Sequence, residues 1–236
     1  MRIRLDKFIS DRLCVTRSEA KNLIKSGRTE VDGICVRTAD THINTDENKV
    51  VCMGKTLSGS EFVYIMMNKP AGIVCAVRDS LSPTVTELIP SDLRRKGLFP
   101  AGRLDKDTEG FVFITNDGQT AHRMLSPSSH VRKEYIAVLE KPAENHYAAR
   151  FAEGMEIDGG EICLPAKLDF TENKYTVRIV LYEGKYHQVK RMISAVGNKV
   201  ISLRRTAIGG ITLDPGLPPG GCREILHKEL QNLYAK

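Results

Sequence analysis

The sequence predicts an α+β protein in two parts, a small helix–helix–β domain and a larger domain built on a mainly antiparallel β-sheet with flanking helices. Apolar residues near the N-terminus recur at helical spacing. From residue 62 onward, segments with strand character outnumber segments with helix character. The stretch TLSGSE at 56–61 separates the two patterns and is typical of a linker. We therefore expect one domain over residues 1–58, linker included, and a second over residues 59–236.

The first 55 residues predict two helices followed by small β-structure. Two apolar sets have helical spacing: Leu5, Phe8, Ile9 and Leu13, then Ala20, Leu23 and Ile24. Thr16 and Glu19 form the T-x-x-E pattern of a capping box, which predicts the start of the second helix. Gly27 is well placed to end it. The segment VDGI at 31–34 predicts a two-residue turn between short strands.

The remainder alternates between strand-like and helix-like segments. Strands are expected in FVYIMMNKP, GFVFITNDG, KEYIAVLEK, KYTVRIVLYEG and KVISLRRTAIGGITL. Helices are expected in GQTAHRML, in HQVKRMISAVG and, at the end of the chain, in HKELQNLY. The segment DPGLPPGG predicts a loop. Because strands outnumber helices, an antiparallel sheet is the expected scaffold of the larger domain.

Composition places the chain among globular proteins of a reducing compartment. It has 236 residues, of which 41% are hydrophobic and 27% are charged. Its six cysteines form no C-x-x-C pair and have no histidine cluster beside them, so a structural zinc site is not expected. No segment has the apolar run of a signal peptide or of a membrane span. We expect a cytoplasmic protein without membrane contact.

The charge balance favours an anionic partner. The net charge is +6, and residues 1–28 hold eight Lys/Arg against three Asp/Glu. Arg17, Lys21 and Lys25 are spaced i, i+4, i+8 and so line one face of the predicted second helix, with Arg28 beyond it. A solvated helix face would carry the same stripe. The alternative is contact with an RNA or DNA backbone.

This segment resembles the S4 RNA-binding domain over roughly residues 2–50. The similarity lies in RLDKFISDRL, in TRSEAKNLIKSGRTEVDGICV and in the basic residues. S4 domains are appended to several enzymes as RNA-docking modules. The resemblance therefore implies RNA contacts by Arg17, Lys21, Lys25 and Arg28, but does not identify the chemistry.

The segment AGRLDKDTEG at 101–110 places Asp105, Asp107 and Glu109 at alternate positions. The pattern suggests the opening of an EF-hand calcium loop, but the twelfth position is Asn116 where a glutamate is required. The preceding GLFPAGRL also contains a proline and a glycine where a helix should run. A carboxylate at a junction between loop and strand can instead be held rigidly at a cleft, and Arg103 lies two residues away.

Several other catalytic classes are excluded by missing motifs. The histidines have no G-x-S-x-G partner, and there is neither G-x-x-x-x-G-K-[ST] nor G-x-G-x-x-G. If the protein is an enzyme, a carboxylate and basic groups must suffice, and we expect no metal and no organic cofactor.

Residues 62–236 resemble the RsuA/RluB-type pseudouridine synthases. The matching segments are MMNKPAGIVCAV, SPTVTELI, FPAGRLDKDTEGFVFITNDG, RKEYIAVLEKP and YEGKYHQVKRMISAVGNKVISLRRTAIGGITL. The combination of GRLDxDTxG with EGxxxQVKRM is highly specific for this family. With the S4-like segment, the resemblance spans nearly the whole chain. It implies that the protein isomerises uridine to pseudouridine in ribosomal RNA and that Asp105 is the catalytic aspartate.

The resemblance also assigns roles to other residues. Forming pseudouridine requires breaking the N–C1′ bond of a flipped-out uridine, turning the uracil and joining its C5 to the sugar. Asp105 would act as nucleophile or stabilise positive charge at C1′. Arg103 matches the arginine that enters the place of the flipped base. Tyr135 matches the catalytic tyrosine of KxY, which packs against the uracil and is a candidate acid or base. Lys190 matches the cation that pairs with the aspartate.

Two neighbours of Lys190 carry open alternatives. Arg191 is adjacent in sequence and is the rival partner for the aspartate. His187 suits either a phosphate or base contact or a structural role. Asp107 and Glu109 are expected to be turn residues rather than catalysts.

The family includes synthases for both ribosomal subunits. The segments YHQVKRM and AVGNKV…RTAIGGITLD favour 16S rRNA as the substrate, either free or in an assembling small subunit. The alternatives are a 23S rRNA synthase and a non-catalytic S4-type ribosome-assembly factor. Retention of Asp105, Arg103, Tyr135 and Lys190 together argues against the non-catalytic factor. One S4 module and one catalytic domain make a monomer sufficient.

Overall fold

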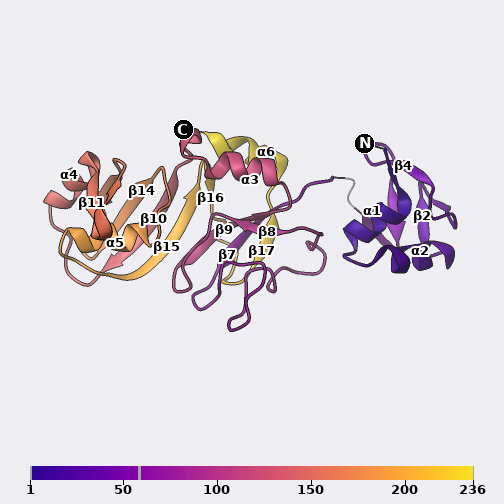
Figure 1. The fold of residues 1–236 in the computed structure, drawn as a ribbon, viewed down its shortest axis with the longest axis horizontal. Coiled ribbons are helices and arrows are strands. Elements are labelled where there is room, and N and C mark those ends of the chain that lie inside the picture. The colour runs from indigo at the N-terminus through magenta and orange to yellow at the C-terminus, as the bar shows by residue number, and fades with distance from the viewer. Residues whose placement is uncertain (1, 58–59, 236) are drawn as a thin grey trace. The chain divides into compact units, whose positions relative to one another are not determined.

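The computed structural model describes residues 2–57 and 60–235. The chain forms two compact units, Met1–Val63 with Pro90–Leu98, and Tyr64–Ile89 with Phe99–Lys236 (Figure 1). Of the predicted linker at 56–61, the first two residues extend a strand, and residues 58 and 59 lie outside the described residues.

The N-terminal unit contains the two predicted helices and short strands. Its elements are β1 (Arg2–Arg4), α1 (Leu5–Arg12), α2 (Arg17–Lys25), β2 (Thr29–Val31), β3 (Ile34–Cys35), β4 (His42–Asn44), β5 (Val50–Cys52) and β6 (Lys55–Leu57). Strands β3-β2-β5-β6 form one sheet, and β1 pairs with β4. The helices bury Leu5, Phe8, Ile9, Ala20 and Ile24 against Ile43 and Val50.

Local signals in this unit act as expected. The Thr16 hydroxyl accepts a hydrogen bond from the Glu19 backbone N–H, and the Glu19 carboxylate accepts one from the Thr16 N–H. This reciprocal capping box begins α2. Asp32 and Gly33 both have positive φ, 52° and 79°, which closes the tight turn between β2 and β3.

The C-terminal unit is built on one large sheet. Its strands are β7 (Tyr64–Lys69), β8 (Phe99–Ala101), β9 (Glu109–Thr115), β10 (Lys133–Leu139), β11 (Met155–Ile157), β12 (Glu161–Cys163), β13 (Lys167–Phe170), β14 (Thr176–Leu181), β15 (Val200–Ile208), β16 (Ile211–Thr212) and β17 (Cys222–Glu224). Its α-helices are α3 (Gly118–Leu125), α4 (His146–Glu153), α5 (Gln188–Ala195) and α6 (His227–Leu230), with short 3-10 turns at Pro127–Ser129, Asp158–Gly160 and Gln231–Tyr234. The main sheet has the order β13-β14-β10-β15-β9-β7-β17.

The prediction of an α+β fold on a mainly antiparallel sheet is confirmed. Most neighbours in the sheet are antiparallel, but β15 pairs with β9 in parallel, at Arg204↔Glu109 and Arg205↔Gly110. Gly110 is required there because a Cβ would lie 2.2 Å from the Arg205 carbonyl oxygen, and its φ is +99°. The parallel pair sets the segment after Asp105 directly beside β15.

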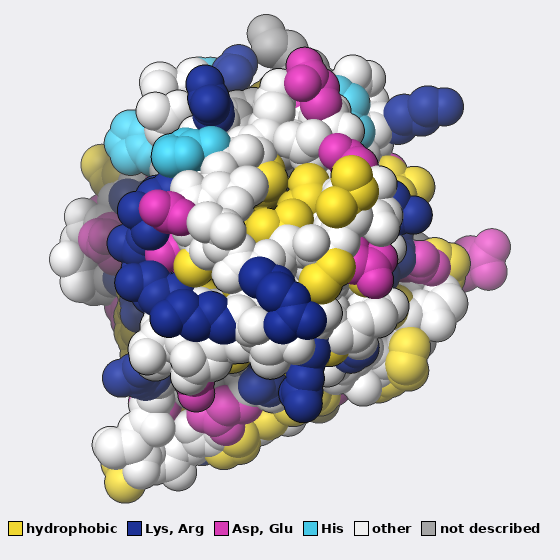
Figure 2. Space-filling view, turned by 90° about the vertical axis from the view of Figure 1, so that its right-hand side faces the viewer, with side chains coloured by type: hydrophobic (Ala, Val, Ile, Leu, Met, Phe, Trp, Pro, Cys, Tyr) yellow, Lys and Arg dark blue, Asp and Glu magenta, His cyan; other side chains and the backbone are white. Residues whose placement is uncertain are grey.

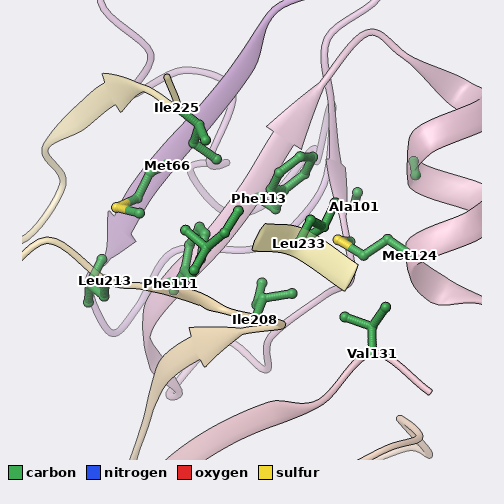
Figure 3. Packing of buried hydrophobic residues seen from close by; sticks show 12 residues of the cluster. Met66, Ala101, Phe111, Phe113, Met124, Val131, Ile208, Leu213, Ile225 and Leu233 are labelled. Carbon is green, nitrogen blue, oxygen red and sulfur yellow. The ribbon is translucent and has the colours of Figure 1, made fainter. Parts of the chain in front are cut away.

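One apolar core supports this half of the sheet. Met66 of β7 and Phe111 and Phe113 of β9 pack with Met124 of α3 and Leu233 near the C-terminus (Figure 3). Strand β9 is buried from Gly110 to Thr115, so the loop that precedes it is anchored at its C-terminal end to a rigid strand.

Some elements carry too little pattern to be expected from the sequence. These are the helix α4 and the short strands β11, β12 and β13, which lie between β10 and β14 in the sequence. The expected closing helix is short, since α6 gives way to a 3-10 turn at Gln231.

Candidate active site

A cavity of about 670 Å³ opens in the C-terminal unit. Its walls include four segments far apart in sequence: the loop at 102–108, strand β10, the turn before α5 and strand β15. Asp105, Tyr135, His187 and Arg103 all line it. The chain thus gathers into one concavity four residues that the sequence proposed for one site.

The Asp105 loop is held by buried cations. The Lys69 ammonium, fully buried at the end of β7, donates hydrogen bonds to the carbonyls of Pro70, Lys106 and Thr108 at 2.7 to 3.1 Å. Arg205 of β15 donates to the carbonyls of Gly102, at 3.0 Å, and Phe111, at 2.8 Å. These bonds clamp the backbone on both sides of Asp105, so its carboxylate has a defined position.

Lys190 is the cation beside the Asp105 carboxylate. Its Nζ lies 3.1 Å from Asp105 Oδ2 and 2.6 Å from Asp107 Oδ1. Burial opposes protonation of Lys190, but the hydrogen bonds from its ammonium to Asp107 and Asp105 outweigh it and raise the pKa of Lys190. The same contact lowers the pKa of Asp107. Asp107 is therefore more than a turn residue, since it shares the cation with Asp105.

His187 approaches Asp105 from the other side. Its Nε2 lies 3.5 Å from Asp105 Oδ1. The residue has left-handed backbone angles, φ 49° and ψ 31°, directly before α5. Its ring stacks on the exposed ring of Tyr186 with centroids 3.7 Å apart. A non-glycine residue in this conformation stores strain, which is typical of functional sites.

Of the two adjacent cations Lys190 and Arg191, only Lys190 forms an ion pair with Asp105 among the described residues. Arg191 forms ion pairs with Asp158 and Glu161 and donates to the Tyr186 carbonyl at 3.1 Å. These contacts tie α5 to the β11–β12 region and hold the turn that carries His187. The structure does not bring Arg191 to Asp105.

Tyr135 and Arg103 complete the predicted set. Tyr135 is buried on β10, where it pairs with Arg205 of β15, and it contributes to the cavity wall. Arg103 is exposed at the cavity edge. A fixed carboxylate beside an ammonium, in a cavity with an aromatic wall, suits reaction at an electron-poor carbon of a planar ligand.

The basic residues predicted to bind RNA lie on the N-terminal unit. Lys21, Lys25 and Arg28 are exposed. Arg17 is exposed as well, and its guanidinium also lies 3.0 Å from the buried carboxylate of Asp6. Figure 2 shows lysine and arginine side chains gathered in a band across one face, beside a smaller hydrophobic group.

Two residues of the cavity wall were missed by sequence reasoning. Lys133 and Arg205 both line the cavity and are almost fully buried. The available signal was Lys133 two residues before Tyr135, hence on the same face of a strand.

Within residues 2–57 and 60–235, no group of three or more His, Cys, Asp or Glu side chains is arranged to hold a metal ion. Over the same residues, no helix has the length and apolar character needed to span a bilayer.

Comparison with known proteins gives a family for each part of the chain. The family model described as RNA pseudouridylate synthase matches residues 63–195, and the S4 domain model matches residues 3–48. An RNA pseudouridine synthase of Bacillus subtilis is 41% identical over 98% of each chain. The ribosomal small subunit pseudouridine synthase A of Escherichia coli K12 is 41% identical over 98% of this chain and all of its own.

A solved structure extends the likeness to three dimensions. A crystal structure of a pseudouridylate synthase covers 98% of this chain and 99% of its own, with 38% identity and a TM-score of 0.69. The family match over the sheet domain and the full-length relatives agree with the geometry around Asp105. The chain belongs to the RNA pseudouridylate synthase family and carries an S4 domain at its N-terminus.

Proposed function

We propose that this enzyme converts a specific uridine of 16S ribosomal RNA to pseudouridine, with Asp105 acting on C1′ of the flipped nucleotide. The observation that carries the reaction is the Asp105 carboxylate, clamped in a cavity and paired with Lys190 at 3.1 Å. The choice of RNA is supported by relatives named ribosomal small subunit pseudouridine synthase A in Escherichia coli and Haemophilus influenzae, the latter 40% identical over 98% of this chain.

The chain's own residues divide the work as follows. Lys190 orients the carboxylate and offsets its charge until C1′ becomes electron-poor. Tyr135 packs against the uracil. Arg103 takes the position among the stacked RNA bases that the flipped base has left. His187 contacts a phosphate or the base, and Arg191 supports the turn that presents His187.

The N-terminal part contributes affinity. Residues 1–58 form the docking domain, in which Lys21, Lys25 and Arg28 contact RNA phosphates, while residues 59–236 carry the reaction. Arg17 joins this surface while it also neutralises Asp6. The protein acts in the cytoplasm as a monomer, without a metal or organic cofactor, on rRNA free or in an assembling small subunit.

Replacing Asp105 with asparagine tests the reaction. The amide keeps the size of the side chain but has neither the charge nor the nucleophilic oxygen, so the variant should bind RNA and form no pseudouridine in single-turnover assays. Asp107→Asn should be slowed less, and Glu109→Gln least. Turnover by Asp105→Asn, or an equal collapse of all three, would mean that another carboxylate acts.

The choice of RNA has a separate test. Mapping pseudouridines in ribosomal RNA from a strain that lacks the gene should reveal one missing site in 16S rRNA. A missing site in 23S rRNA would overturn the substrate while leaving the reaction intact.

A further inference from the structure

Two buried cations line the Asp105 cavity without a carboxylate partner. Lys133 of β10 is 7% exposed and Arg205 of β15 is 1% exposed. Their hydrogen-bond partners are backbone carbonyls, Val131 for Lys133 and Gly102 and Phe111 for Arg205, and among residues 2–57 and 60–235 no ion pair joins either side chain to a carboxylate. Buried charges are costly unless something compensates them. An arrangement of this kind is expected where a ligand supplies negative charge.

The two cations share one wall. Lys133 and Tyr135 alternate along β10 and so lie on the same face, and Tyr135 pairs with Arg205 across the strands. Backbone carbonyls hold Arg205 through its Nε and Nη2 atoms. Lys133 Nζ donates to the Val131 carbonyl at 3.1 Å, and an ammonium has three donors. The wall thus offers charged donors beside the tyrosine proposed to pack against the uracil.

The surroundings of Lys133 lower the pKa of its ammonium. Its cross-strand neighbour on β14 is Leu181, and the charged groups that act on it are Arg205 of β15 and Glu183 after β14. Burial, and then repulsion by Arg205, lower the pKa of Lys133 to about 8. At neutral pH the wall therefore carries two positive charges, and it loses one as the pH rises through about 8.

We propose that Lys133 and Arg205 stabilise the uracil while it is detached from the sugar and negatively charged. This inference rests on the proposed reaction at Asp105. When the C1′–N1 bond breaks, its electron pair leaves with N1 and the charge spreads to the uracil oxygens, while the Asp105 carboxylate compensates C1′. Attack of C5 on C1′ then uses an electron pair of the anion and gives a neutral adduct that still carries its C5 proton. Loss of that proton from C5 and gain of a proton at N1 give the neutral base of pseudouridine. Lys133 and Arg205 act on the anion and not on the substrate's neutral base, so they favour the step itself.

The test is single-turnover pseudouridine formation from pH 6 to 10 on an RNA that the wild type modifies. The variants are Lys133→Met, Lys133→Arg and, as a matched control, Lys174→Met, whose exposed side chain lies outside the cavity lining. The wild-type rate should fall above a pH of about 8. Lys133→Met should be about 10- to 100-fold slower at neutral pH, the worth of a hydrogen bond to a charged group, and should lack that alkaline fall. Lys190 does not confuse this reading, because its pKa is raised above the ordinary 10.5.

Two further measurements separate this role from a merely structural one. Lys133→Arg should recover most of the rate and shift the fall to higher pH. A target 5-fluorouridine carries its negative charge more easily once detached, so the deficit of Lys133→Met in consuming the nucleotide should shrink at least threefold. RNA affinity should change less than twofold in every variant.

Several outcomes would overturn the inference. These are full activity in Lys133→Met, an unchanged alkaline fall in that variant, or equal deficits on uridine and 5-fluorouridine. If Lys133→Met does not fold, the wild-type profile and Lys133→Arg decide, since an identical fall in both would reject the role of Lys133. Activity in Asp105→Asn would instead remove the reaction on which the inference rests.

Discussion

Replacing Lys190 with methionine removes an ammonium that pairs with both Asp105 and Asp107. The charges of Lys190 and Asp105 are separated by 3.1 Å. With an effective dielectric constant of about 20, such a pair interacts by roughly 5 kcal/mol before desolvation. The Lys190 and Asp105 side chains are each 26% exposed, so in the variant water can solvate the Asp105 carboxylate and replace much of the lost interaction energy. A net loss of about 2 kcal/mol is typical of a hydrogen bond between charged groups, and corresponds to about 30-fold in rate.

Single-turnover pseudouridine formation measures this loss directly, because product release does not enter. Lys190→Met should bind RNA within about threefold of the parent, since most of the affinity comes from distributed phosphate contacts. Lys190→Arg should retain most activity because it keeps the cation. Arg191→Met, whose lost charge faces Asp158 and Glu161, should slow the reaction less than Lys190→Met.

The reasoning fails if Lys190→Met reacts within threefold of the parent rate. It also fails if Arg191→Met is the more damaging change, since the cation that matters to Asp105 would then be the neighbour. Thermal unfolding of each variant shows whether a loss of rate reflects the site or a loss of folded protein.

Three further predictions concern the rest of the chain. Burial acts to raise the pKa of Asp6, but hydrogen bonds from Arg4 and Arg17 outweigh it and hold that pKa below its ordinary 3.8. Asp6→Asn should therefore destabilise the N-terminal unit at neutral pH, and the difference in unfolding free energy should shrink as the pH falls through that lowered pKa. Changing Lys21, Lys25 and Arg28 to glutamine should reduce the slope of log affinity against log salt by about 2, and an unchanged slope would remove them from the RNA contact. A chelator should leave turnover unchanged on an RNA whose folding is independent of metal, whereas complete loss would reopen the calcium reading of the loop after Asp105.

Local structure was largely predictable from the sequence, because its causes lie within a few residues. The Thr16–Glu19 capping box begins α2, and Asp32–Gly33 closes the β2–β3 turn. Each depends on interactions between near neighbours in the chain. Asp105 as the candidate catalyst came from resemblance in its motif and not from periodicity or composition.

Only the tertiary structure distinguished Lys190 from Arg191. Consecutive helical residues point about 100° apart, since a turn holds 3.6 residues, so one of the pair had to face away from Asp105. Which one does so depends on how α5 packs in the fold and on where Asp105 lies relative to it, and the place of Asp105 is not encoded within α5. The burial of Val189, Met192 and Ile193 sets how α5 packs, and sends Arg191 to Asp158 and Glu161.

The placement of Lys133 and Arg205 in the wall of the Asp105 cavity could not be predicted from the sequence alone either. Alternation along β10 places Lys133 beside Tyr135, but it does not say which face of the strand is buried. The pairing of Tyr135 with Arg205 joins residues 70 positions apart, and a shift of one residue would turn Arg205 to the opposite face. Long-range strand register, and the close approach of β15 to Gly110, decide which charges surround the Asp105 cavity.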